Sequence, residues 1–89
     1  MPRICFTRHL EAVGPCQPVE YAGRTVGELL QAVAADYPRL PGYVLDDQGR
    51  VRKHIAIFVD GALRPRQSAL ASPVGESSEI YVFQALSGG

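Results

Sequence analysis

Two segments of the chain, residues 54–60 and residues 79–84, alternate strictly between aliphatic residues and other residues. Alternation with a period of two is typical of a β-strand that buries one face. We therefore predict a strand in each segment, with the aliphatic side of both strands on a common core. The residues predicted to form that buried side are Ile55, Ile57, Val59, Ile80 and Val82.

Weaker strand signals occur elsewhere in the chain. Residues 3–8 and residues 19–21 predict a first and a second strand, and the segment between them reads as a loop because it holds glycine and prolines. The turn pair Asp60-Gly61 predicts a hairpin to a short returning strand, residues 62–64, which Pro65 should stop. These segments bring the predicted number of strands in the sheet to four or five.

A single helix is predicted between the second and third strands. Thr25 and Glu28 have the spacing of a capping box, in which the Thr25 hydroxyl accepts from the Glu28 N–H and the Glu28 carboxylate reaches back to the Thr25 N–H. Pro38 disfavours helical geometry at the residue before it, so the predicted helix is Val26–Asp36. Its apolar stripe, at steps of three and four, is Val26, Leu29, Leu30, Val33, Ala34 and Tyr37.

The order of the predicted elements favours one small α+β domain. Residues 39–53 give mixed signals and are expected to form an irregular insertion, with a short helical turn or a small hairpin. Strand, strand, helix, strand, short strand and strand is the order of a β-grasp fold, a mixed sheet packed on one main helix. We assign residues 1–84 to this domain and residues 85–89 to a flexible C-terminal tail.

Composition and charge exclude several classes of function. Nine Lys and Arg balance nine Asp and Glu, so no excess of positive charge favours nucleic acid or an anionic membrane as a partner. No stretch approaches the roughly 20 apolar residues of a membrane span, and the start of the chain lacks the apolar core of a secretion signal. A cytoplasmic protein is therefore expected.

The side chains that most often carry chemistry form no catalytic or metal-binding pattern. Cys5 and Cys16 form no CxxC pair, have no zinc-ligand spacing with His9 or His54, and are too few for a cysteine-ligated iron–sulfur cluster. We expect two free thiols, with a disulfide or a redox role as the alternative. The pair Asp46-Asp47 in a turn-rich segment is typical of a solvated loop. The sequence predicts no metal site and no enzyme active site.

The most unusual segment is the end of the chain, Leu86-Ser87-Gly88-Gly89. Two residues without side chains let a tail pass through a narrow channel in a partner. An α-carboxylate at Gly89 would be ionised at neutral pH, since its ordinary pKa is about 3.5, and could attack the α-phosphate of ATP. The chain has no Gly-rich phosphate loop, so another protein should bind the ATP. A frayed terminus without function is the alternative.

Three motifs make the chain resemble the MoaD/ThiS family of ubiquitin-like sulfur carriers over essentially its whole length. They are Thr25-Val26-Gly27-Glu28-Leu29-Leu30, His54-Ile55-Ala56-Ile57-Phe58-Val59-Asp60-Gly61, and Val82-Phe83 leading to Gly88-Gly89. The resemblance implies that an E1-like enzyme adenylates Gly89, which becomes a thiocarboxylate that donates sulfur in a biosynthetic pathway. It also implies a sulfur donor protein and a sulfur-accepting enzyme as partners, ATP used by the E1-like enzyme, and no cofactor bound by the chain itself.

The chain departs from the family pattern in two places. Gln84-Ala85 stands where many members have Pro-Pro, and Ser77-Ser78-Glu79 stands where many have Gly-Asp-Glu. Without the prolines the tail should be less stiff, which leaves the identity of the partner more open than the carrier role. The insertion at residues 39–53 is more similar to longer carriers of amino-acid or specialised sulfur metabolism than to short thiamin-type ones.

The aromatic residues Phe58, Tyr81 and Phe83 fall on the face of the sheet opposite the predicted core. An exposed aromatic cluster is typical of a protein-binding surface. We predict that this face docks the activating enzyme beside the tail. A second small cluster covered by the insertion is the alternative.

Three functions remain open at this point: a sulfur carrier, a ubiquitin-like modifier conjugated through Gly89 to target lysines, and a non-covalent adaptor. The carrier and the modifier share adenylation of Gly89, whereas an adaptor has no need of the Gly-Gly end. Lys53 is the only lysine, so chains linked through this protein would have a single site, which favours the carrier. The sulfur acceptor stays open among a molybdopterin precursor, a thiazole, a cysteine precursor, a siderophore and a tRNA.

Overall fold

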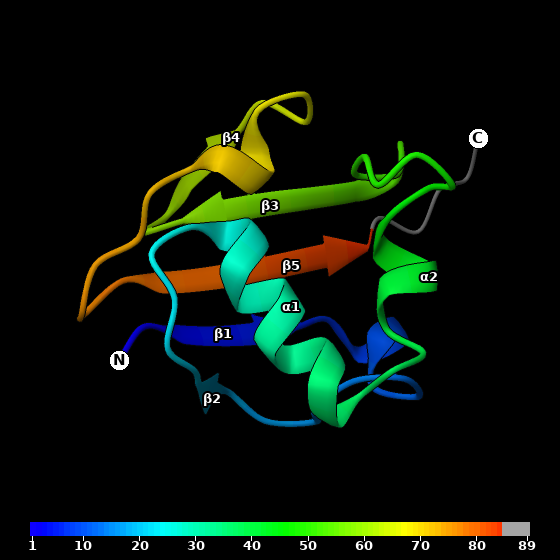
Figure 1. Cartoon of the computed structure of the whole chain (residues 1–89), viewed down its shortest axis with the longest axis horizontal. Helices are drawn as coiled ribbons and strands as arrows, with labels where there is room; N and C mark the ends of the chain where they lie inside the picture. Colours follow the sequence, from blue (N-terminus) through cyan, green and yellow to red (C-terminus); the bar gives the residue numbers. More distant parts are fainter. Residues whose placement is uncertain (85–89) are drawn as a thin grey trace.

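A mixed five-stranded sheet organises residues 1–84, which are the residues that the structure, a computed structural model, describes (Figure 1). The strand order across the sheet is β2-β1-β5-β3-β4. The strands are β1 (Arg3–Phe6), β2 (Val19–Glu20), β3 (Ile55–Val59), β4 (Ala62–Arg64) and β5 (Glu79–Gln84). The last strand thus lies at the centre, parallel to β1 and antiparallel to β3. The predicted tail, residues 85–89, lies outside the described residues.

Helix α1 (Val26–Asp36) packs across one face of the sheet and has the predicted bounds (Figure 1). Thr25 Oγ1 accepts from the Glu28 N–H at 3.1 Å, as the capping box predicts. The prediction for the reciprocal bond was wrong by one residue, because the Glu28 carboxylate accepts from the Arg24 N–H at 2.8 Å. An isolated β-bridge between Thr25 and Pro73 holds the backbone of the capping residue in place directly before the helix starts.

The core lies between α1 and the sheet, as the alternation of the strands predicts. The register of the central strands aligns the aliphatic residues in rows, with Ile80 opposite both Ile4 and Val59. Because their side chains then meet across neighbouring strands, they bury together against the helix. Eight residues that the hydrophobic pattern predicts for the core are buried: Leu29, Leu30, Val33, Ile55, Ile57, Val59, Ile80 and Val82. Ala34 and Tyr37 of the predicted helix stripe are half-buried.

The insertion at residues 39–53 contains both of the structures offered as alternatives. Helix α2 (Pro41–Val44) is one short turn, and a β-bridge between Leu45 and Val51 closes a small hairpin after it. Gly49 occupies the tip with φ of 79°, a left-handed conformation that glycine adopts without strain. The insertion belongs to the core, since Leu40, Val44 and Val51 are almost completely buried.

Three predicted strands were too long by one or two residues. The first ends at Phe6 because the N–H of Leu10 bonds to the carbonyl of Thr7 and turns the chain into a 3₁₀ helix, Arg8–Leu10. The second ends at Glu20. The third excludes His54 and Asp60, since Asp60 adopts a positive φ of 51° in the hairpin turn.

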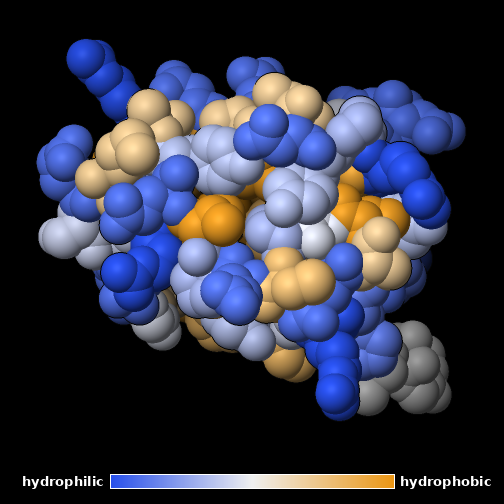
Figure 2. Space-filling model, turned by 90° about the horizontal axis from the view of Figure 1, so that it is seen from below, coloured by the Kyte–Doolittle hydropathy of each residue, from blue (hydrophilic) through white to orange (hydrophobic). Residues whose placement is uncertain are grey.

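The face of the molecule on the β2 side is mixed rather than dominated by apolar residues. Figure 2 views the molecule from the β2 side of the sheet and shows hydrophobic areas that are small and separated by hydrophilic residues.

A second 3₁₀ helix, Ala69–Ala71, covers the start of α1. None of the helices in residues 1–84 combines the length and the apolar character that crossing a membrane requires.

Candidate functional site

The candidate site is the end of the central strand, from which the predicted tail continues. Gln84 is the last residue of β5, and its N–H donates to Thr7 Oγ1 at 3.1 Å. On the other side, Gln84 pairs with Ile55 of β3. The Thr7 N–H in turn bonds to the carbonyl of Val82 at 3.1 Å. The strand end is therefore held from both sides up to the last described residue.

The residues assigned to the reaction itself lie beyond this point. The predicted adenylation residue Gly89, and the tail residues Leu86, Ser87 and Gly88, are outside the described residues, so their roles stay predictions. What the structure supplies is the fixed point from which they start. A segment of five residues spans at most about 17 Å, which limits how far the reaction centre can lie from Gln84.

The aromatic residues share the sheet face opposite α1, as the alternation predicts. Tyr81 and Phe83 are each 40% exposed, and their ring centroids lie 6.1 Å apart at an interplanar angle of 32°. Their separation is within the range of favourable aromatic pairs. Phe58 is only half-buried rather than fully exposed, because it lies opposite Tyr81 on one side and Leu63 on the other. Tyr81 and Phe83 lie on the strand that leads to the tail, and Phe58 lies on the neighbouring strand β3.

The sequence reasoning missed three members of this surface, of which Ala56 lies opposite Phe83. Leu63 is 60% exposed and Cys5 is half-buried, and the sheet register places them in one row with Tyr81 and Phe58. We call the six residues of this side the aromatic face: Cys5, Ala56, Phe58, Leu63, Tyr81 and Phe83. The Asp60-Gly61 turn pair was the available signal for Leu63, since a two-residue hairpin fixes which residues of β4 lie opposite β3.

Both thiols are free, as predicted. Burial, with a contribution from the neighbouring Glu79 carboxylate, raises the pKa of the Cys5 thiol above its ordinary value. A thiol of raised pKa is a poor nucleophile at neutral pH, because the thiolate is the reactive form. Cys16 is exposed on the loop between β1 and β2. The geometry gives Cys5 a packing role on the aromatic face.

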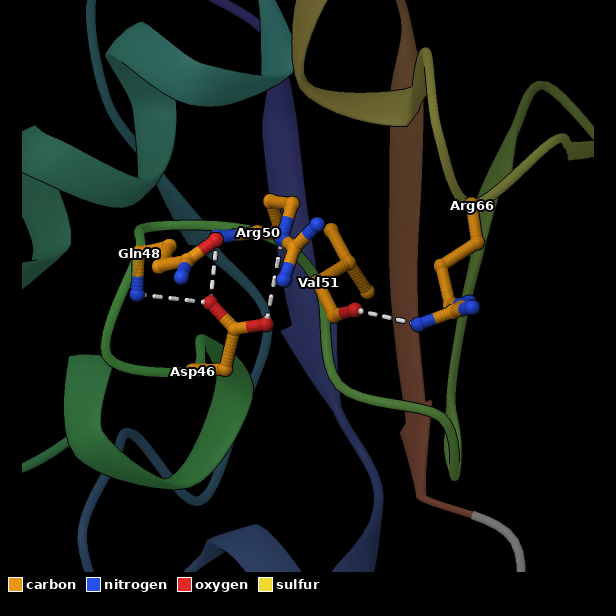
Figure 3. A network of polar contacts seen from close by, with 5 residues as sticks. All are labelled: Asp46, Gln48, Arg50, Val51 and Arg66. Atoms are coloured by element: carbon orange, nitrogen blue, oxygen red, sulfur yellow. Dashed lines mark hydrogen bonds and ion pairs between the residues drawn. The ribbon is translucent and has the colours of Figure 1, made fainter.

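Asp46 has a structural role in the hairpin of the insertion, whereas Asp47 is exposed beside it (Figure 3). The Asp46 carboxylate accepts from the N–H groups of Gln48 and Arg50, each at 2.9 Å, and lies 3.4 Å from Arg50 Nε. The hydrogen bond from the Arg50 backbone is the main reason that the pKa of Asp46 is lowered. The acidic pair therefore shapes a loop, as the sequence predicts.

The two histidines lie on different segments of the chain. His9 is exposed in the 3₁₀ helix after β1, and His54 is exposed directly before β3. Among residues 1–84, no three His, Cys, Asp or Glu side chains are grouped so that they could hold a metal ion. Among the described residues, the feature that suits a function is the fixed end of β5 at Gln84, bordered by the exposed aromatic face.

Comparison with known proteins gives a family match that includes the tail residues. The sequence model of the ThiS family matches residues 6–89. The small archaeal modifier protein 3 of Haloferax volcanii is 28% identical over 65 residues, which cover 73% of this chain and 70% of that protein.

The fold is that of ubiquitin-like β-grasp proteins of known structure. A chain of the BexX/CysO complex of Amycolatopsis orientalis superposes with a TM-score of 0.87 at 18% identity, with both chains fully covered. CysO of Mycobacterium tuberculosis gives 0.84 at 17% identity, covering 97% of this chain and 100% of the other. SAMP1 of Haloferax volcanii gives 0.76 at 24%, covering 99% and 98%. With a β-grasp fold and a family match through Gly89, the chain belongs to the ThiS family of ubiquitin-like sulfur carriers and modifiers.

Proposed function

We propose that this protein is a cytoplasmic sulfur carrier whose Gly89 carboxylate is adenylated by an E1-like enzyme and converted to a thiocarboxylate. The observation that carries the proposal is the family match, which includes Gly88-Gly89 as well as the folded domain. The structure supports it by ending the central strand at Gln84, a fixed point directly before the tail. The chain acts as a co-substrate rather than a catalyst.

The chemistry requires two substitutions, the first at the α-phosphorus of ATP and the second at the carbonyl carbon of Gly89. A carboxylate oxygen of Gly89 attacks the α-phosphorus of ATP, so that an acyl adenylate forms and pyrophosphate leaves. A sulfur nucleophile equivalent to hydrosulfide, supplied through the donor protein, then attacks the carbonyl carbon. The C–O bond to the adenylate breaks, and AMP leaves with the electron pair of that bond. The product is a thiocarboxylate, whose sulfur is passed to the acceptor of a biosynthetic pathway. All groups that bind ATP belong to the E1-like partner.

The aromatic face is proposed as the docking surface for that enzyme. Tyr81 and Phe83 are on the strand that carries the tail, so an enzyme that holds this face also holds the point where the tail enters its active site. Aromatic side chains are enriched among the residues that carry most of the binding energy in interfaces. The strand end before the tail is fixed by its neighbours on both sides. This matters for the reaction because a reacting group has to be placed accurately.

A protein modifier is the second candidate, and the relatives favour it as an alternative. The curated relative and one structural neighbour are named small archaeal modifier proteins. In this version the activated Gly89 carbonyl is attacked by the amine of a target lysine, and an isopeptide bond forms instead of a thiocarboxylate. The first step, adenylation of Gly89, is the same.

One reaction mixture distinguishes the two products. The purified chain, whose intact mass first verifies that it ends at Gly89, is incubated with its E1-like enzyme, ATP, hydrosulfide and a lysine-rich acceptor protein. A carrier gains the mass difference between sulfur and oxygen. A modifier forms conjugates in which the Gly89 acyl group, without added sulfur, is joined to lysines of the acceptor protein. Formation of conjugates with no thiocarboxylate at any time point would replace the carrier proposal by the modifier one.

A further inference from the structure

A basic pocket of about 580 Å³ lies between the insertion and the loop that follows β4. Four of the nine Lys and Arg side chains of the chain line it, against one of the nine acids. The neutral total charge therefore conceals a positive pocket and a net negative remainder. The charged residues and the histidine that line the pocket are Asp46, Arg50, Arg52, Lys53, His54 and Arg66.

Two of the three arginines that line the pocket donate to backbone carbonyls. Arg66 Nη1 donates to the carbonyl of Val51 at 3.1 Å, and Arg52 Nε donates to the carbonyl of Gly42 at 3.2 Å. Figure 3 shows Arg66 and the Asp46–Arg50 hairpin on either side of Val51. Each guanidinium has five donors in a fixed fork, so most donors stay available after one is used.

The single acid does not neutralise the pocket. The Asp46 carboxylate already accepts from two backbone N–H groups and pairs with the Arg50 side chain. Its negative charge is therefore compensated within the hairpin. Lys53 is exposed and has no hydrogen bond or ion pair within residues 1–84. The charge that the pocket presents to a partner is therefore positive.

The pocket is next to the point where the tail starts. His54 lines it, and the following residue, Ile55, is the strand partner of Gln84. The half-buried Leu70, which packs against the core, gives the pocket an apolar part on the α1 side of the sheet. Gln84 thus lies between the aromatic face on one side of the sheet and the basic pocket on the other.

We propose that the basic pocket binds an acidic segment of the E1-like enzyme, one with Asp or Glu beside an apolar residue. This inference rests on the proposed function and names the chemistry of the partner surface. Guanidinium forks match carboxylates in a bidentate geometry, and the half-buried Leu70 accepts a hydrophobic neighbour of those carboxylates. Charge complementarity beside the tail accelerates association and fixes the orientation in which the tail enters the active site.

A nucleic acid fits the same pocket less well. Proteins that hold single strands combine a basic groove with aromatic side chains on which bases stack, but Phe, Tyr and Trp are absent from the lining. The four cations surround one concave site, whereas binding to a duplex needs charges spread along a backbone. The acidic peptide is therefore the occupant that the lining favours.

The enzyme-binding test uses a double charge reversal, K53E with R66E, in the full chain. Its matched control, R24E with R39E, changes the charge equally at exposed positions outside the pocket. We expect the pocket variant to bind the E1-like enzyme about tenfold more weakly at low ionic strength and the control to bind as the wild type does. The difference should shrink near 1 M salt, where the Debye length is about 3 Å. Equal affinity of the pocket variant and the control overturns the proposal.

A peptide titration tests the pocket without the enzyme. Hexaglutamate, inorganic phosphate and a hexameric RNA are added separately to the labelled wild-type chain at matched ionic strength. We expect hexaglutamate to shift the amide signals of residues 50–54 and 66–70, and the R52Q variant, which keeps the fold but loses a guanidinium, to respond less. A larger response to phosphate or RNA overturns the acidic-segment assignment.

The two proposals fail in different ways. If the wild type binds hexaglutamate in the pocket but gains no sulfur at Gly89, the carrier function is wrong and the pocket stands as an acidic-peptide site. If K53E with R66E forms the thiocarboxylate with the kcat/KM of the wild type, the pocket proposal is wrong and the carrier function stands. Thermal unfolding of each variant verifies that the fold is retained.

Discussion

The N–H of Gln84 donates to the Oγ1 atom of Thr7 at 3.1 Å, across a sequence separation of 77 positions. This bond closes the end of the central strand against the segment that follows the first strand. Thr7 is buried, although most threonines are exposed. The side chain acts as an acceptor where the neighbouring β1 no longer extends, since β1 ends at Phe6.

Replacement of Thr7 by valine should loosen the strand end, because valine keeps the shape but removes the acceptor. We expect a loss of about 1–3 kcal/mol in the free energy of unfolding, since the Gln84 N–H is left unpaired. The Gln84 amide should also exchange faster with solvent. Thr7→Ser is the matched control, since it keeps the oxygen. Equal exchange rates in the valine variant and the wild type would show that the bond does not hold the strand end.

The core assignment predicts large losses at Leu30 and Ile57. Truncating either residue to alanine should cost about 2–5 kcal/mol, because it removes buried methyl groups and leaves a cavity. Leu63→Ala is the control, since the side chain is 60% exposed and the cost should stay near 0.5 kcal/mol or less. Urea unfolding measures all three. Similar losses at all three positions would contradict the assignment of the faces.

The aromatic face is tested by Phe58→Ala and Phe83→Ala. Each change should weaken binding to the E1-like enzyme by about 2 kcal/mol or more if the face contains the residues that dominate the interface. Tyr43→Ala is the control, since Tyr43 is 48% exposed on α2, away from this face. Isothermal titration of the four chains measures the affinities. If the Tyr43 variant loses as much as the others, the docking surface is elsewhere.

The pattern of the sequence predicts the regular elements because the forces that form them are local. The capping residue Thr25 and the following Pro38 define both ends of α1, and alternation defines the facing of β3 and β5. The buried residues of the irregular segments were not predicted. Leu10 and Val44 are completely buried, but a segment without a period shows no face, and tertiary contacts alone decide its burial.

The basic pocket could not be predicted for a related reason. Its cations come from residues 50–53 and from Arg66, which are brought together only by the hairpin of β3 and β4. The net charge of zero, taken over the whole chain, argues against a charged surface. The exposure of Leu63 on the aromatic face depends in the same way on the register of two strands.

The pairing of Tyr21 with Asp36 predicts a decline of stability at high pH. The Tyr21 hydroxyl donates to Asp36 Oδ2 at 2.7 Å, and this bond is the main reason that the pKa of Tyr21 is raised to about 12. A raised pKa means that the folded state favours the protonated phenol. The stabilisation is therefore complete below the ordinary pKa of about 10 and is lost as the pH rises through about 12.

Tyr21→Phe should remove this part of the alkaline decline, and Tyr43→Phe is the matched control. Denaturant unfolding at a series of pH values from neutral to strongly alkaline measures the effect. The account requires the Tyr21 variant to differ from the wild type most at neutral pH and to approach it at the alkaline end. A constant difference over the whole range would show that the hydrogen bond to Asp36 is not the cause.

The most direct test of the central claim is the mass of the chain after incubation with its E1-like enzyme, ATP and a sulfur donor. We predict a gain equal to the replacement of one oxygen by sulfur, located at Gly89 by fragmentation. Deleting Gly89, or adding one residue after it, should abolish the gain, because even a small misplacement of a reacting group costs about 100-fold in rate. Addition of one sulfur atom to Cys5 or Cys16 as a persulfide, in the full chain and in the Gly89 deletion alike and with no oxygen replaced at Gly89, would contradict the account.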